Sequence, residues 1–210
     1  MKLYDQIVSF VYCNNFDIIY TYHQHFSLLL QDKFLNCSKK SILEIGSGNG
    51  RDARYFAKKG HDLVAIDQSH IGAEIGGDLK LKNIKFIEDD FVSMDYSIYG
   101  GIDVVYSRFT WHAVKEDEAC IVIDKVRKIL NKGGYFAIEV RSTKDPLCGV
   151  GKNVGKNEWL TDHYRRFVES DYFLKFLLEK GFKLIYFTEE NNLSIYKEDN
   201  PVLIRIVLEK

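Results

Sequence analysis

The chain has little that could cross-link or interrupt a fold, with four cysteines and two prolines in 210 residues. Cys13, Cys37, Cys120 and Cys148 lie far apart and form no C-x-x-C pair. In a chain without an export signal, such cysteines are expected to be reduced and mostly buried. The length suits one α/β domain with a well-buried core.

Long apolar runs are also missing. No segment approaches the roughly 20 apolar residues that span a bilayer. The first 20 residues are apolar, but Asp5, Asn14 and Asp17 interrupt them, so they lack the continuous stretch of a signal peptide. We therefore expect a cytoplasmic protein without membrane contact.

An excess of one charge is absent, since 29 lysines and arginines face 30 aspartates and glutamates. No field of the whole chain attracts nucleic acid or anionic lipid, so a dedicated nucleic-acid binder is disfavoured. Metal-ligand spacing is absent too. His23 and His25 share a strand face but not a helix face, and no third ligand of suitable spacing follows, so no metal is expected.

Strand and helix patterns alternate from about residue 40, which is typical of βαβ units and a mostly parallel sheet. Strands are expected at residues 41–46, 61–67, 84–90, 102–107, 135–142, 182–189 and 201–209, the last two as a hairpin. Helices are expected at residues 51–60, 69–81, 116–130 and 171–181.

One domain is expected over residues 1–210. It comprises an N-terminal helical cap (1–40), a cofactor-binding core (41–141), a substrate-side connection (142–169), and a last helix with a C-terminal hairpin (170–210). Residues 143–169 are expected to form a long irregular connection, and loops of that length are often functional.

The stretch LEIGSGNGRD places Gly46, Gly48 and Gly50 directly after an apolar run. A glycine turn after a strand lets a cofactor approach the backbone, although a tight turn without a ligand has the same pattern. The dinucleotide pattern G-x-G-x-x-G is not met, because Arg51 stands where its third glycine would fall. No Gly-Lys-Ser/Thr follows, which excludes a P-loop.

Carboxylates stand at the ends of three successive expected strands, at Glu44, Asp67 and Asp90. A carboxylate at the end of the second strand can accept both hydroxyls of a ribose. Asp90, followed by Phe91, suits the amino group and the face of an adenine. Three acids favour a positively charged cofactor without phosphates, and S-adenosylmethionine fits that description.

With E-x-G-x-G-x-G, an acid at the end of the second strand, DDF and DVVYS in order, the chain resembles a class I S-adenosylmethionine-dependent methyltransferase. The likeness is close over residues 40–140. It implies a Rossmann-like, seven-stranded, mostly parallel sheet with an antiparallel last strand, helices on both faces and an N-terminal helical extension. It also implies S-adenosylmethionine as cofactor and S-adenosylhomocysteine as its product.

The resemblance assigns cofactor contacts residue by residue. The glycines form the turn under the methionine and ribose, and Glu44 helps to anchor the methionine end. Asp67 holds the ribose, Asp90 the adenine amino group, Phe91 borders the adenine, and Ser107, just past the fourth strand, offers backbone contacts. The full expected set is Glu44, Gly46, Ser47, Gly48, Gly50, Arg51, Asp67, Gln68, Asp90, Phe91 and Ser107.

Arg51 and Asp52, which follow the glycine turn, each have two possible interpretations. Arg51 either meets the methionine carboxylate or is a solvated residue of the first helical turn. Asp52 lies in that same turn, where the helix dipole favours an anion, so capping is the simpler interpretation.

The acceptor should lie at the carboxyl ends of the strands, where open α/β sheets bind ligands. Arginines collect there, and their planar forks suit phosphates and carboxylates, so a small anionic acceptor is expected. Ion pairs with Asp103, Glu139, Asp162 or Glu169 would instead make the arginines structural. The expected substrate-binding residues are Arg108, Trp111, Arg141, Tyr164, Arg165 and Arg166.

A hydroxyl acceptor would also need a base, whereas a phosphate or carboxylate oxygen would not. His112 and His163 are the candidate catalytic residues because imidazole titrates near neutral pH. His112 could equally be a packed residue after the fourth strand.

The combination of GNGRD, YSRFxxHA, HYRRF and IYKEDNPVLIR resembles a narrower group of small bacterial methyltransferases. Members occur in surface-polysaccharide clusters, including capsule clusters for O-methyl phosphoramidate groups. That resemblance implies O-methylation of a capsule or surface-polysaccharide precursor. Trp111 departs from the group, which has an apolar residue such as leucine there.

Two other function classes remain open on the sequence. One is a nicotinamide-dependent oxidoreductase, and the other is a non-catalytic methyltransferase-like binding protein. A nucleic-acid methyltransferase is disfavoured, because SRFTW stands where an N-P-P-Y type signature would be. The sequence assigns no oligomeric state.

Overall fold

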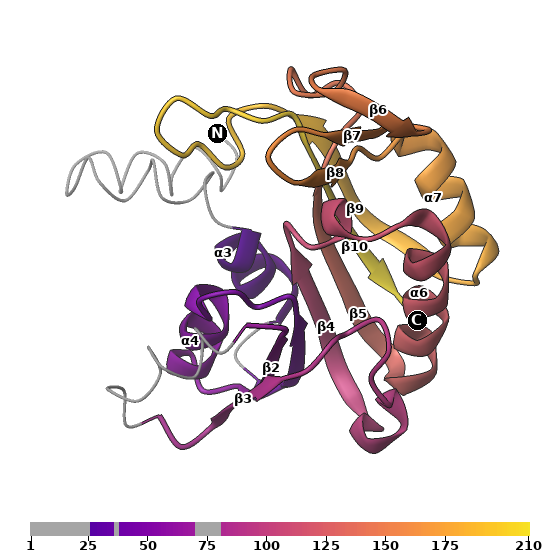
Figure 1. Cartoon of the computed structure of the whole chain (residues 1–210). Helices are drawn as coiled ribbons and strands as arrows, with labels where there is room; N and C mark the ends of the chain where they lie inside the picture. The colour runs from indigo at the N-terminus through magenta and orange to yellow at the C-terminus, as the bar shows by residue number, and fades with distance from the viewer. Residues whose placement is uncertain (1–25, 36–37, 70–80) are drawn as a thin grey trace, which may run out of the picture.

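The computed structural model describes residues 26–35, 38–69 and 81–210. Its centre is one seven-stranded sheet with the order β3-β2-β1-β4-β5-β10-β9 (Figure 1). The strands are β1 (Ser41–Ile45), β2 (Asp62–Asp67), β3 (Ile84–Glu88), β4 (Ile102–Arg108), β5 (Leu130–Arg141), β9 (Lys183–Glu190) and β10 (Leu203–Glu209).

The first five strands pair in parallel, while β10 runs antiparallel to both β5 and β9. The expected Rossmann-like sheet with an antiparallel last strand is therefore confirmed. Because parallel strands end at the same edge, the segments that follow β1, β2 and β4 meet there.

Helices cover both faces of this sheet (Figure 1). One face packs against α3 (Phe26–Leu30), which continues as a π-helical turn over Gln31–Leu35, and against α4 (Arg51–Lys58). The other packs against α6 (Glu116–Ile129) and α7 (Ser170–Glu179). Short 3-10 turns, η2 (Tyr96–Tyr99) and η3 (Trp111–Ala113), flank β4.

The apolar side chains of β5 alternate between the two faces of the sheet. Phe136, Ile138 and Val140 belong to the α6–α7 core, whereas Ala137 belongs to the α3–α4 core. Successive side chains of a strand point to opposite faces, so a strand buried on both sides is apolar almost throughout.

Some predictions lie outside the described residues. They include most of the helix expected over 69–81, most of the N-terminal cap, the histidine pair His23 and His25, and two cysteines, Cys13 and Cys37. Cys120 and Cys148 are free thiols and half-buried. None of the helices that the structure describes is long and apolar enough to cross a membrane.

The connection after β5 is not irregular throughout, so that prediction was wrong in part. It contains a three-stranded antiparallel sheet of β6 (Lys152–Gly155), β7 (Glu158–Leu160) and β8 (Tyr164–Arg166). Strands of three or four residues are too short to show a two-residue hydrophobic period. The small sheet lies at the same end of the molecule as the β9–β10 loop (Figure 1).

A buried ion pair joins the central strands. Glu139 of β5 and Arg205 of β10 are directly opposite in the antiparallel ladder and form an ion pair with 2.5 Å between Oε2 and Nε. Both side chains are on the face that α3 covers, and the Arg205 guanidinium lies over the Phe26 ring at 5.4 Å. The sheet therefore carries a buried charged pair on this face.

We expect Arg205→Leu to lower the free energy of unfolding by about 3–5 kcal/mol, because it leaves the Glu139 carboxylate buried without its main partner. Urea unfolding followed by circular dichroism measures the change. Lys183→Leu is the control, since its 4.0 Å pair with Glu209 is largely exposed and should contribute below about 1 kcal/mol. Equal changes in the two variants would contradict a structural role for the buried pair.

Candidate active site

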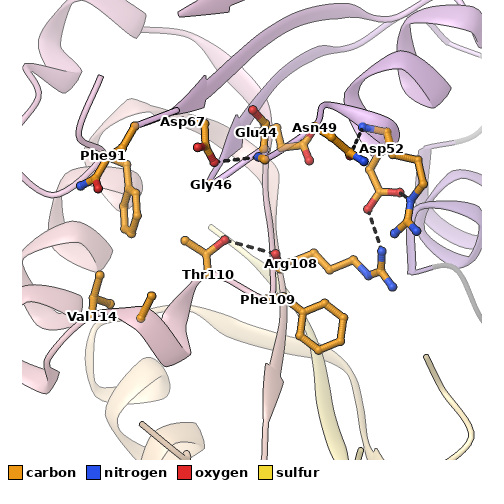
Figure 2. A pocket seen from close by; sticks show the side chains of 15 residues that line it. Glu44, Gly46, Asn49, Asp52, Asp67, Phe91, Arg108, Phe109, Thr110 and Val114 are labelled. Atoms are coloured by element: carbon orange, nitrogen blue, oxygen red, sulfur yellow. Dashed lines mark hydrogen bonds and ion pairs between the residues drawn. The ribbon is translucent and has the colours of Figure 1, made fainter. Parts of the chain in front are cut away.

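A cleft of about 420 Å³ opens at the carboxyl ends of β1, β2 and β4. Figure 2 shows Phe91 and Asp67 toward one end of it and Asp52 and Arg108 toward the other. Its lining comprises Glu44, Gly46, Ser47, Gly48, Asn49, Arg51, Asp52, Asp67, Gln68, Phe91, Arg108, Phe109, Thr110, Ala113 and Val114. Most of the residues expected to bind a cofactor are thus brought together.

The three glycines after β1 all have left-handed backbones, with φ of 71° at Gly46, 52° at Gly48 and 69° at Gly50. A Cβ at Gly46 would lie 2.2 Å from Thr110 Oγ1, and one at Gly50 would lie 2.3 Å from the Phe86 ring. At Gly48 a Cβ would meet nothing within 4 Å. Gly46 and Gly50 therefore permit close packing, whereas Gly48 keeps backbone open toward the cleft.

Asp67 ends β2 beside this turn. Its Oδ2 accepts a hydrogen bond from the Gly48 N–H at 2.7 Å, and its Oδ1 accepts from the Ser69 N–H at 2.9 Å and the Ser69 hydroxyl at 2.7 Å. The carboxylate is thus fixed at the rim of the cleft, between the glycine turn and Gln68.

Glu44 carries the least satisfied carboxyl group of the cleft. The residue is 3% exposed, and its Oε2 has no hydrogen-bond partner among the described residues. Burial raises the pKa of this carboxyl well above its usual range, and the nearby Asp52 raises it further. A buried, unpaired carboxyl group next to a cavity is suited to a cationic ligand.

Asp90, Phe91 and Ser107 occupy different surroundings. Asp90 accepts hydrogen bonds from the Val92 N–H at 3.0 Å and the Ser93 hydroxyl at 2.9 Å, within its own turn. Phe91 lines the cleft. Ser107 is fully buried inside β4 rather than past its end, so that placement was wrong. The contacts predicted for Asp90 and Ser107 stay predictions.

A second cavity of about 380 Å³ adjoins the cleft. Arg51, Arg108 and Phe109 line both, so they form the wall between them. Phe109 has a left-handed backbone with φ of 54°, which is strained for an aromatic residue and is often found at functional sites. The second cavity is lined by Arg51, Arg108, Phe109, His112, Arg141, His163, Arg165, Ser194, Ile195, Tyr196 and Asp199.

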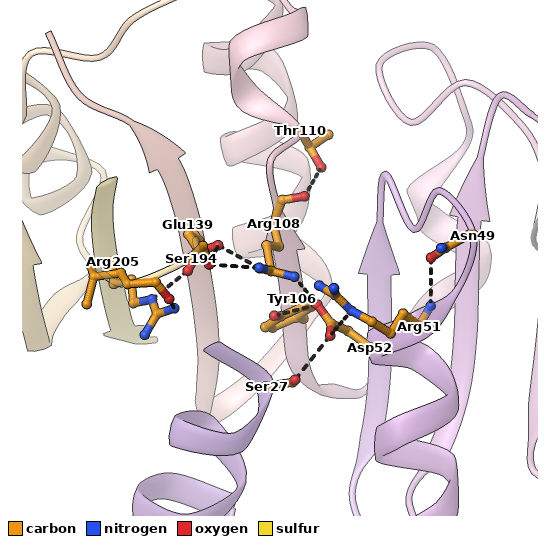
Figure 3. A network of polar contacts seen from close by, with 11 residues as sticks. Ser27, Asn49, Arg51, Asp52, Tyr106, Arg108, Thr110, Glu139, Ser194 and Arg205 are labelled. Atoms are coloured by element: carbon orange, nitrogen blue, oxygen red, sulfur yellow. Dashed lines mark hydrogen bonds and ion pairs between the residues drawn. The ribbon is translucent and has the colours of Figure 1, made fainter. Parts of the chain in front are cut away.

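Arg108 is held from three directions (Figure 3). Its Nε donates to Glu139 Oε1 at 2.6 Å, its Nη1 to Asp52 Oδ2 at 3.3 Å, and its Nη2 to the Ser194 hydroxyl at 2.8 Å. Asp52 is buried and also accepts from the Tyr106 hydroxyl at 3.0 Å. Asp52 therefore connects α4 to β4 through side-chain contacts, and within the described residues it makes no capping hydrogen bond to the start of its helix.

The remaining predicted arginines diverge. Arg141, nearly buried, pairs with Asp145 at 2.9 Å and with Asp199. Arg165 donates to Asp162 at 3.1 Å. Each arginine of the second cavity thus has a carboxylate partner. Of the partners that the ion-pair alternative named, Glu139 and Asp162 take part, and the others are Asp52, Asp145 and Asp199.

Arg166 does not share the cavity with Arg165, because neighbouring residues of β8 point to opposite sides. It is buried and donates from Nε to the Val114 carbonyl at 2.8 Å and from Nη2 to the Trp111 carbonyl at 3.2 Å. Trp111 is fully buried in the core. Trp111, Tyr164 and Arg166 are absent from the lining of both cavities, so the structure does not place them with the other predicted acceptor residues.

Both candidate bases line the second cavity. His163 is half exposed, and its Nδ1 lies 3.0 Å from Asp162 Oδ2. The Nδ1 of His112 is shielded from solvent and has no hydrogen-bond partner among the described residues. Burial, with the nearby Arg141 cation, lowers the pKa of His112 from 6.5 to about 4.

Sequence reasoning missed several residues of the two cavities. Thr110 was not predicted. Asp52 was interpreted as a residue that caps the first turn of α4, whereas it lines the cleft and pairs with Arg108. Ser194, Tyr196 and Asp199 lie in the loop between β9 and β10. Part of this loop belongs to the IYKEDNPVLIR motif, which carried a family resemblance but no predicted site role. No local pattern brings that loop to the ends of β4 and β5.

Comparisons with known proteins agree with this arrangement. The sequence profile of a family described as "Methyltransferase domain" matches residues 21–186. An uncharacterized methyltransferase of Bacillus mycoides (strain KBAB4) is 29% identical over 151 residues, which cover 68% of this chain and 70% of the relative.

Solved structures share the fold at low identity. The 1,6-didemethyltoxoflavin-N1-methyltransferase of Burkholderia thailandensis, bound to 1,6-didemethyltoxoflavin and S-adenosylhomocysteine, superposes with a TM-score of 0.70 and 15% identity, over 98% of this chain and 85% of that one. The glycopeptide N-methyltransferase MtfA, bound to S-adenosylhomocysteine, gives a TM-score of 0.66 and 15% identity, over 87% of each chain.

We expect the His112 imidazole to stay neutral from about pH 5.5 to about pH 8. The pKa of this imidazole is 6.5 in the unfolded chain and about 4 in the folded chain. The free energy of unfolding should therefore fall as the pH is lowered from 6.5 to about 4, by up to about 3 kcal/mol. NMR of the ring carbons gives the titration, and His112→Gln assigns its signal and should remove that part of the pH dependence. A midpoint at or above the ordinary histidine value would refute the prediction.

Proposed function

The chain belongs to the methyltransferase domain family, and from that premise we propose that it transfers the methyl group of S-adenosylmethionine to a small anionic acceptor. The observation that carries this proposal is the pair of adjoining cavities. One holds a glycine turn and an unpaired buried carboxyl group, and the other is lined by arginines and histidines. Among the described residues, Arg51, Arg108 and Phe109 line both and separate them.

The residues of the cleft fit the donor. Gly48 leaves open backbone toward the cavity, Asp67 is fixed where ribose hydroxyls would be accepted, and Phe91 offers an apolar face. Glu44, whose Oε2 is unpaired among the described residues, suits the positive methionine end. When bound, S-adenosylmethionine supplies an activated methyl group on a positively charged sulfur.

The lining of the second cavity favours an anion as acceptor. Arg51, Arg108, Arg141 and Arg165 present guanidinium groups to it, and Asp199 is the one acid in the part of the lining that the structure describes. The Arg51 side chain is 54% exposed and its contact with Asp52 is long, at 3.4 Å, so its donors remain available. Arginine forks bind phosphates and carboxylates in the two-point geometry that orients a substrate.

His163 is the better placed base for a hydroxyl acceptor. Asp162 lies against its Nδ1, which leaves Nε2 as the ring nitrogen that can receive a proton. His112, with its lowered pKa, stays neutral and adds a polar group to the wall. An acceptor that reacts through a phosphate or carboxylate oxygen would use His163 as a binding group instead.

The narrower sequence resemblance supports a more specific acceptor. O-methylation of a capsule or surface-polysaccharide precursor, including one in phosphoramidate biosynthesis, requires a small phosphorylated or otherwise anionic substrate. A cavity of about 380 Å³ with four arginines is compatible with such a molecule.

Asp67→Ala should weaken S-adenosylhomocysteine binding by about 1–3 kcal/mol, the scale of lost charge-assisted hydrogen bonds. Isothermal titration calorimetry gives the affinity. Asp62→Ala at the opposite, exposed end of β2 is the control and should leave it unchanged. Unchanged affinity in Asp67→Ala would contradict the ribose role, and tight NAD binding without S-adenosylhomocysteine binding would replace the proposed function with an oxidoreductase.

Arg165→Gln should raise the KM for the acceptor about tenfold or more, since a hydrogen bond to a charged group contributes about 1.5–3 kcal/mol. The assay follows labelled methyl from S-adenosylmethionine into the small anions of the source cell, separated by anion exchange. Lys152→Gln removes an exposed cation of the same small sheet and should leave KM unchanged. Labelled products that are all neutral or cationic would rule out the anionic acceptor.

A further inference from the structure

One wall of the proposed acceptor cavity comes from the loop between β9 and β10. Ser194, Ile195, Tyr196 and Asp199 of this loop all line the cavity. In the sequence these residues lie more than 50 positions after the ends of β4 and β5, which line the same cavity. The loop therefore decides what can enter from that side.

The base of the loop is firmly held. Leu193 and Ser194 are buried, and the Ser194 hydroxyl accepts from Arg108 Nη2 at 2.8 Å. Asn192 and Asn200 close the base with two hydrogen bonds, from the Asn192 N–H to Asn200 Oδ1 and from Asn200 Nδ2 to Asn192 Oδ1, both 2.8 Å.

The tip of the loop, residues 195–199, is attached differently. Tyr196 is 71% exposed, and its backbone pairs with that of Asp199 through two hydrogen bonds of 2.9 Å. Within the described parts of the chain, the polar contacts that join this tip to the protein body are those from Arg141 to the Asp199 carboxylate. One ion pair thus holds the tip over the cavity.

Arg141 also pairs with a second carboxylate, which is buried. Asp145 is fully buried at its side chain, lies 2.9 Å from Arg141 Nη1, and accepts from the Leu147 N–H at 2.8 Å. Asp199, by contrast, is 44% exposed at its side chain. Arg141 and Asp145 already balance each other, so Asp199 adds a negative charge to a cavity in which the other charged residues of the described lining are arginines.

We propose that Asp199 occupies the subsite for the acceptor's anionic group at Arg141, and that the acceptor must displace it to bind. The proposal rests on the proposed function, which it deepens by naming the anion subsite and its internal competitor. A carboxylate or a phosphate can replace Asp199, because either matches the guanidinium fork. A neutral molecule cannot, so Asp199 excludes uncharged molecules of similar shape.

The physical consequence is a reduced apparent affinity. When a site is free for only part of the time, the apparent dissociation constant rises by the inverse of that fraction. A tethered carboxylate competes at an effective concentration in the millimolar range. Removing its charge should therefore strengthen binding of a free anion at Arg141.

The test measures binding of inorganic phosphate and of acetate to the full-length chain by calorimetry at constant ionic strength. Asp199→Asn should bind the preferred anion at least about fivefold more tightly than the unsubstituted chain. Glu198→Gln is the matched control, because it removes the same charge from the exposed neighbouring position, and it should change affinity by less than about twofold. The anion whose affinity increases more, phosphate or acetate, indicates whether the acceptor carries a phosphate or a carboxylate.

The Asp199→Asn substitution is tested together with Arg141→Lys, because lysine keeps the positive charge but lacks the planar fork. In that double variant, Asp199→Asn should no longer increase the anion affinity. Equal gains in Asp199→Asn and Glu198→Gln, or a gain that survives Arg141→Lys, would overturn the proposal. Equal anion binding in all variants would overturn the role of Asp199 while leaving the anionic acceptor in place. If S-adenosylhomocysteine binds but neither anion does, the anionic acceptor fails as well.

Discussion

The arrangement of both cavities depends on how the Arg108 guanidinium is held. Its three donor groups reach α4 through Asp52, β5 through Glu139 and the β9–β10 loop through Ser194. Because Glu139 also pairs with Arg205 of β10, the network runs across the sheet from the cleft to the last strand. A planar group with fixed donors permits one arrangement of these elements, so the wall between the cavities is set by hydrogen bonds as well as by packing.

The sheet and the cofactor cleft could be predicted from the sequence because their signals are local. Apolar runs bounded by glycine and acid define the strands, and the parallel pattern brings their carboxyl ends together. Glu44, Asp67 and Phe91 were each predicted from their position at or near the end of a strand, and all three line the cleft. Asp90 was identified by the same rule, yet its carboxylate bonds within its own turn, since strand ends are also where turns need side-chain acceptors.

The acceptor side was less predictable because its contacts join distant segments. Arg165 and Arg166 look equivalent in the sequence, but they alternate on β8, and that strand is too short to predict. Trp111 lies just beyond the end of β4, which Arg108 closes, yet η3 turns it into the core, where its ring centroid is 5.9 Å from that of Phe136. Asp199 reaches Arg141 only because β9 and β10 place their connecting loop over the end of β5.

The charges of the two cavities are opposite, and the wall between them must serve both. The cleft carries Glu44, Asp52 and Asp67, which suits a cationic donor, while the other cavity carries the arginines. An unpaired Arg108 at the boundary would repel a positively charged ligand in the cleft. Asp52 and Glu139 pair with Arg108, and the Phe109 ring beside it is apolar. Arg51 is then the wall cation whose side chain stays more than half exposed. Arg141 and Arg165 line the second cavity and not the cleft. Under the proposed function they would therefore orient an anion without facing the cofactor.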